Sequence, residues 1–137
     1  MNKIIVITFL LNLFFCSILP AAELTVSVQG IENSQGKIRI ALFSDPNEFP
    51  VGKFMKGESL FVEKQEAIIS FEDLQPGKYA VAAYHDINNN EKLDRNFVGI
   101  PKEPYGFSGK KGFGTPNFSR AQFTFGETDK SLIIKMK

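Results

Sequence analysis

The stretch AIISFEDLQPGKYAVAAYH, residues 67–85, decides the fold class. Its first part places every second residue on one apolar face, and its last part is an apolar run suited to the middle of a sheet. Between them, Pro76 sets the backbone for a turn and Gly77 tolerates positive φ. The stretch therefore predicts two strands, 67–71 and 79–85, joined by a tight corner.

Turn signals and the same two-residue period continue on both sides of this stretch. Further strands are predicted at 24–28, 37–43, 60–62, 121–125 and 131–136. A turn at 33–36 is expected to join the first two of them into an antiparallel hairpin. No segment of helical length shows a 3.6-residue apolar stripe. About seven short strands therefore predict an all-β fold, a single antiparallel, immunoglobulin-like β-sandwich.

Residues 1–22 have the three-part pattern of a secretory signal peptide. Lys3 gives a positive start, 4–19 is an almost unbroken apolar run, and the small residues at 20–22 precede the first acidic residue. The apolar run is short for a membrane-spanning helix. We therefore expect cleavage, which removes residues 1–22 and leaves a domain at 23–137.

The cleavage site has two candidates, after Ala22 or after Ala21. Either cut predicts an exported protein, periplasmic or secreted, and no membrane insertion of the mature chain. The only cysteine, Cys16, is removed with the signal. The mature domain is therefore expected to have no disulfide, no thiol nucleophile and no cysteine metal site.

Charge is balanced in the mature domain. Residues 23–137 contain all 15 Asp and Glu and, because Lys3 is removed, 15 of the 16 Lys and Arg, so the formal net charge is 15 − 15 = 0. Nucleic acids and anionic membranes both favour proteins with a basic excess. We therefore expect neither as a partner, and we expect a monomer.

The main chemical signal is the loop Asp86-Ile87-Asn88-Asn89-Asn90-Glu91-Lys92-Leu93-Asp94. Oxygen-bearing side chains stand at its positions one, three, five and nine, the spacing of an EF-hand-type calcium loop. The metal ligands predicted from this spacing are Asp86, Asn88, Asn90, the backbone carbonyl of Lys92, and Asp94. The loop is therefore a candidate Ca²⁺ site.

Two positions depart from the calcium pattern. Glu91 stands sixth, where glycine makes the sharp turn, and Phe97 stands twelfth, where a bidentate glutamate belongs. Glu91, Glu103 or Asp73 are candidates for the missing ligand. The alternative to calcium is an Asx-rich turn in which Asp86 and Asn88 bond their own backbone.

Residues 96–118 alternate aromatic residues with glycine and proline. The aromatic residues could form a stacking platform for a sugar or a peptide. The interpretation that we favour is a loop folded back on the sandwich, with its aromatic side chains in a secondary core.

The loop and the segment after it resemble a known family. The residues that carry the resemblance are His85-Asp86-x-Asn88-x-Asn90-x-Lys92-Leu93-Asp94, Asn96-Phe97-x-Gly99-Ile100-Pro101-Lys102-Glu103-x-Tyr105-Gly106-Phe107-Ser108 and Phe113-Gly114-x-Pro116-x-Phe118. This pattern is similar to the bacterial domain of unknown function 2141. The resemblance implies an exported bacterial domain of unassigned activity and supplies no catalytic residues.

A second resemblance concerns the corner Phe71-x-x-Leu74-x-Pro76-Gly77-x-Tyr79. It is similar to the strand corner of transthyretin-like and carboxypeptidase-regulatory-like sandwiches, which implies the same fold class and no function.

Together these observations predict an exported, non-enzymatic module whose calcium-stabilised loop presents a surface to a protein or a glycan. One alternative is a small hydrolase that uses His85 and Asp86, although no serine motif accompanies them. Another is a purely structural domain without a ligand.

Overall fold

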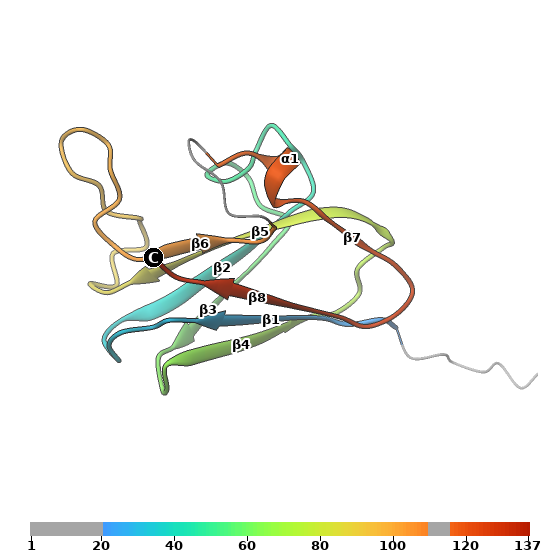
Figure 1. Ribbon diagram of the computed structural model, residues 1–137, viewed down its shortest axis with the longest axis horizontal. Helices are drawn as coiled ribbons and strands as arrows, with labels where there is room; N and C mark the ends of the chain where they lie inside the picture. The colour runs from blue at the N-terminus through green and yellow to red at the C-terminus, as the bar shows by residue number, and fades with distance from the viewer. Residues whose placement is uncertain (1–20, 110–115) are drawn as a thin grey trace, which may run out of the picture.

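A computed structural model describes residues 21–109 and 116–137 of the chain (Figure 1). Its elements are β1 (Leu24–Gln29), β2 (Lys37–Phe43), β3 (Lys56–Phe61), β4 (Glu66–Phe71), β5 (Gly77–Asp86), β6 (Tyr105–Phe107), α1 (Phe118–Ala121), β7 (Phe123–Phe125) and β8 (Lys130–Lys135). The predicted all-β fold is confirmed. The signal peptide expected at 1–22 lies almost wholly outside the described residues.

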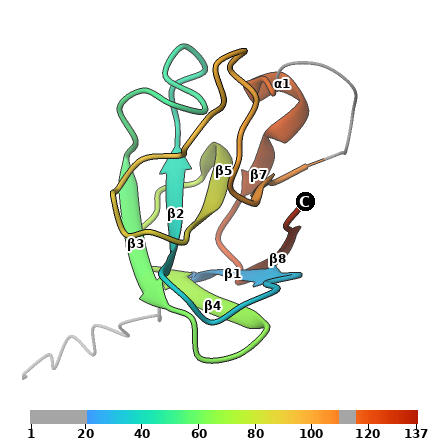
Figure 2. The ribbon, with the colours of Figure 1, turned by 90° about the vertical axis from the view of Figure 1, so that its left-hand side faces the viewer.

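The strands form two sheets. One has the order β4-β1-β8, and the other has the order β3-β2-β5-β6, with β7 pairing with β5. Figure 2 shows β1, β4 and β8 on one side of the molecule and β2, β3 and β5 on the other. This is the predicted sandwich, but it is not wholly antiparallel, because β1 and β8 pair in parallel. Within the described residues, no helix is long and apolar enough to span a membrane.

The predicted hairpin of the first two strands is wrong. β1 pairs antiparallel with β4 and parallel with β8, whereas β2 pairs with β3 and β5 in the other sheet. The chain crosses between the sheets through residues 30–36, where Gly30 and Gly36 adopt positive φ. Alternation shows that a segment is a strand, but a turn between two strands does not show that they pair.

The main core lies between the two sheets. Alternate residues of β1, β2 and β4 are buried, and so are most residues of β5. Ile134 of β8 and Phe125 of β7 complete this core. The corner predicted at 76–77 lies between β4 of one sheet and β5 of the other, so the chain crosses from sheet to sheet there.

A second, aromatic core covers the other face of β2 and β5. Phe43, Phe49, Ala80, Phe118 and Ala121 are its buried members. The rings of Phe43 and Phe49 meet edge to face with 5.4 Å between centroids, and Phe49 meets Phe118 in the same way at 6.1 Å. Helix α1 therefore lies against the sheet through this cluster.

The aromatic residues of segment 96–118 divide between this core and solvent. Phe118 is buried in the second core and Phe107 packs against it, as the folded-back interpretation expects. Phe97 is fully exposed. Phe113 lies outside the described residues. The segment thus combines a packed part with a protruding part.

Candidate functional site

The predicted ligand loop leaves the sandwich at the end of β5. We call residues 87–102 the projecting loop, because it extends beyond the sheets at the left of Figure 1. We call residues 86–94 together with Glu103 its base, which carries the acidic and amide side chains of the calcium prediction. Its tip carries Phe97.

Asp86 anchors the base from inside the protein. Its side chain is fully buried, and Oδ2 accepts a hydrogen bond from Nε of Arg39 at 2.6 Å. The backbone amide of Asn90 donates to Oδ1, and that of Glu91 donates to Oδ2, both at 3.0 Å. Burial alone would raise the pKa of Asp86, but the guanidinium and the two amides outweigh it and hold this pKa below its ordinary value.

Asn88, Asn90 and Asp94 form the outer part of the base. The side-chain amides of Asn88 and Asn90 donate to the two carboxylate oxygens of Asp94 at 2.7 and 2.8 Å. The amide oxygens of the two asparagines accept from the backbone N–H of Asn90 and Lys92. These are the Asx turns of the alternative interpretation.

The structure therefore joins all five predicted ligands in one hydrogen-bond network, in which Asp86, Asn88, Asn90 and Asp94 take part through their side chains. Lys92 takes part through its backbone N–H, and this residue is exposed. In the described part of the chain, no three His, Cys, Asp or Glu side chains are grouped to hold a metal ion. Calcium binding stays a prediction.

Glu103 closes the loop at its base. Its buried carboxylate accepts the backbone N–H of Ile87 at 2.9 Å and that of Asp94 at 3.0 Å, so one side chain ties the start of the loop to its middle. The sequence suggested Glu103 only as a spare metal ligand. In the structure, its carboxylate instead accepts hydrogen bonds from two backbone N–H groups that would otherwise lack an acceptor.

Arg39 was not anticipated from the sequence. It lies on β2 opposite Tyr84 of β5, and it also contacts Glu91 at 3.2 Å. The paired carboxylate of Asp86 raises the pKa of Arg39. A single basic residue in an alternating strand carries no signal for this pairing, which depends on the register of β2 with β5.

The tip of the projecting loop is apolar and exposed. The side chain of Phe97 is 101% exposed, and those of Val98 and Ile100 are 63% and 59% exposed. A turn holds them in place, because Oδ1 of Asn96 accepts the backbone N–H of Val98 and Ile100. The tip is thus an ordered structure that presents apolar side chains to solvent.

His85 and Asp86 do not form an accessible catalytic pair. His85 is 1% exposed, and its Nε2 lies 2.6 Å from the carbonyl oxygen of Gln35. Its Nδ1 is buried and has no hydrogen-bond partner among the described residues. Asp86 is occupied by Arg39 and two amides. The hydrolase alternative would need a side chain that substrate could reach.

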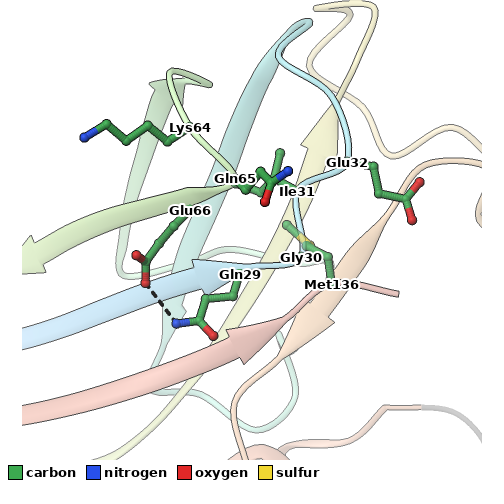
Figure 3. A pocket seen from close by; sticks show the side chains of 8 residues that line it. All are labelled: Gln29, Gly30, Ile31, Glu32, Lys64, Gln65, Glu66 and Met136. Atoms are coloured by element: carbon green, nitrogen blue, oxygen red, sulfur yellow. Dashed lines mark hydrogen bonds between the residues drawn. The ribbon is translucent and has the colours of Figure 1, made fainter.

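An open hollow of about 870 Å³ lies at the end of β1 (Figure 3). Glu66 on its wall accepts hydrogen bonds from Ser27 and from Gln29, the latter at 2.9 Å. These bonds lower the pKa of Glu66, that from Ser27 most. Its carboxylate thus already has two neighbouring hydrogen-bond donors.

Comparison with known proteins assigns the chain to a family. No curated protein and no solved structure matches the chain. The model of one family, described as "Uncharacterized protein conserved in bacteria (DUF2141)", matches residues 26–133. This match covers nearly all of the sandwich together with the projecting loop, as the loop pattern led us to expect. The chain therefore belongs to the DUF2141 family of uncharacterized bacterial proteins.

Proposed function

We propose that this protein is an exported, non-enzymatic β-sandwich module that binds a partner through the tip of its projecting loop. The observation that carries the proposal is the complete exposure of Phe97 beside exposed Val98 and Ile100. Apolar side chains gathered on a surface mark interaction sites, because water contact with them is unfavourable until a partner covers them. Export rests on the signal-peptide pattern of residues 1–22.

The construction of the base supports a binding role. Asp86 and Glu103 accept four hydrogen bonds from loop backbone N–H groups at 2.9–3.0 Å. A loop fixed before binding loses less conformational entropy on association than a mobile one. The base would thus lower the entropic cost of binding at the tip.

We further propose that calcium binds weakly at the outer base. The contacts of both asparagine side chains with the carboxylate of Asp94 support this site, since they bring three oxygen-bearing groups together. An ion would need the amide oxygens of Asn88 and Asn90 to turn toward it, with the carbonyl of Lys92 as a further ligand. Asp86 would contribute least, because Arg39 already neutralises it.

Photo-crosslinking in cells that make the protein tests the binding role. A benzophenone amino acid replaces Phe97 in one variant and Phe61, which is 71% exposed on β3, in a matched variant. The proposal predicts adducts to a protein, glycan or lipid from position 97 and none, or far fewer, from position 61. Equal labelling from both positions, or none from either, would refute it. The expectation of a protein or glycan partner stays a prediction that the mass of the adduct decides.

A further inference from the structure

The tip of the projecting loop has a local charge that the domain as a whole does not have. Residues 95–102, RNFVGIPK, contain Arg95 and Lys102 and no acidic residue, whereas the domain from residue 23 onward is formally neutral. The adjoining carboxylates of Asp94 and Glu103 accept hydrogen bonds within the base, and Glu103 is buried. Both cationic side chains are exposed. They flank the apolar residues in the sequence, so the tip combines an apolar end with a basic margin.

Most backbone N–H groups of the tip, residues 95–102, are hydrogen-bonded within it. The N–H of Asn96 donates to the carbonyl of Ile100 at 2.8 Å, and the N–H of Gly99 donates to the carbonyl of Asn96 at 2.9 Å. Oδ1 of Asn96 takes the N–H groups of Val98 and Ile100, and Arg95 Nη1 donates to the carbonyl of Gly99 at 3.0 Å. The N–H groups of Asn96, Val98, Gly99 and Ile100 thus all have an acceptor within the tip, which lowers the cost of placing these residues where water is scarce.

We propose that the partner at this tip is the surface of an anionic lipid bilayer, which the neutral net charge of the whole domain did not lead us to expect. Phe97, Val98 and Ile100 enter the boundary between headgroups and acyl chains, while Arg95 and Lys102 contact the phosphates. A bilayer accepts a convex apolar tip without a matching pocket, and its charge complements the two cations. This inference rests on the proposed binding role of the tip and names its partner.

The test uses the absence of tryptophan from the chain. Phe97→Trp places one fluorophore at the tip, and Phe61→Trp places a control at an exposed position on β3. The mature protein is recovered after export, with its N-terminus checked by mass spectrometry, because residues 1–22 would themselves partition into lipid. Vesicles of phosphatidylcholine alone and vesicles with phosphatidylglycerol are then titrated into each variant.

In anionic vesicles, we expect the emission of Phe97→Trp to shift to shorter wavelength and to be quenched by brominated acyl chains. The emission of Phe61→Trp should do neither. In sedimentation with the same vesicles, Phe97→Ala should weaken binding about tenfold. Lys102→Gln should weaken it about fivefold, and salt should reduce that difference. Ile133→Ala, which shortens a similarly exposed residue on β8, should have no effect.

Two results would overturn the lipid assignment. One is an unchanged emission spectrum of Phe97→Trp with both kinds of vesicle, which would leave a protein or glycan as the partner. The other is equal binding to neutral and anionic vesicles, because the cations would then contribute nothing. Neither result touches the binding role itself, which the crosslinking comparison of positions 97 and 61 decides separately.

Discussion

The base and the tip of the projecting loop distribute their side chains in opposite ways. At the base, the charged residues Asp86 and Glu103 are buried, while at the tip the apolar residues Phe97, Val98 and Ile100 are exposed. A folded protein ordinarily buries apolar groups and leaves charges in water. Here both exceptions occur within one short segment, residues 86–103.

The difference shows that the side chains at the two ends of the loop have different roles. Each buried carboxylate accepts hydrogen bonds from two loop amides, so its burial gives order to a segment without regular secondary structure. The exposed apolar side chains are not covered by any part of the described chain. The base therefore serves folding, whereas the tip is the part that we propose for association.

The largest effect is expected when Asp86 is removed. Asp86→Ala leaves Arg39 without its buried partner and leaves the amides of Asn90 and Glu91 without an acceptor, so it should lower the free energy of unfolding by about 3–5 kcal/mol. Urea denaturation measures this. Glu63→Ala, at an exposed position, is the control and should stay within about 0.5 kcal/mol. Equal losses in both variants would show that the base does not anchor the loop.

A smaller loss is expected at Glu103. Glu103→Ala removes the acceptor for two backbone amides that lie near the surface, where water replaces it in part, so we expect about 2 kcal/mol. Amide hydrogen exchange should show faster exchange at Ile87 and Asp94 in this variant. Unchanged exchange at both amides would contradict the tie that Glu103 makes across the loop.

Calcium should change the free energy of unfolding by less than the Glu103→Ala substitution does. With a dissociation constant near 1 mM, typical of weak extracellular sites, about 10 mM calcium should add about 1.5 kcal/mol. The thermal midpoint in calcium and in chelator measures this. Asp94→Ala should abolish the difference and Glu63→Ala should preserve it. An identical wild-type midpoint in both buffers would show that calcium does not bind the folded protein at this concentration.

Low pH should reduce the stability that Asp86 gives to the base of the projecting loop. The folded-state pKa of Asp86 lies below its ordinary value, so the stability that its charge contributes is complete above the unfolded-state pKa and is lost as pH falls through the folded-state pKa. The difference in unfolding free energy between wild type and Asp86→Asn should be constant near neutral pH and shrink in acid. A difference that grows in acid would reverse the sign that we assign.

The smallest effect on stability is expected at the tip. Phe97→Ala removes a side chain that is 101% exposed, so the free energy of unfolding should change by no more than about 0.5 kcal/mol. The same substitution should abolish most of the binding at the tip. A large loss of stability would mean that Phe97 packs against the protein, and the contrast between base and tip would fail.

Much of this architecture could be predicted locally. The strands at 37–43, 67–71 and 79–85 follow from two-residue alternation and from the Pro76-Gly77 corner. β6 was missed because it has three residues in a segment rich in glycine and proline, where alternation is too short to detect. The strand predicted at 121–125 begins too early, because α1 includes Ala121 and β7 starts only at Phe123.

The site could be predicted only as a group of oxygen-bearing residues. The spacing of Asp86, Asn88, Asn90 and Asp94 indicated that their side chains gather, and a shared hydrogen-bond network joins them. Neither the ion pair with Arg39 nor the exposure of Phe97 could be read from the spacing. Aromatic residues in a glycine-rich segment have the same composition whether they pack or protrude.

The sequence by itself determined an all-β chain, an oxygen-rich loop and membership of its family, because alternation, turn residues and loop spacing are properties of neighbouring positions. Tertiary structure alone decided which strands pair, which aromatic residues are covered, and which cation meets Asp86. Arg39 and Asp86 are 47 positions apart, and only the register of β2 against β5 brings them together. Contacts of that range depend on the packing of the whole sandwich, which no local pattern encodes.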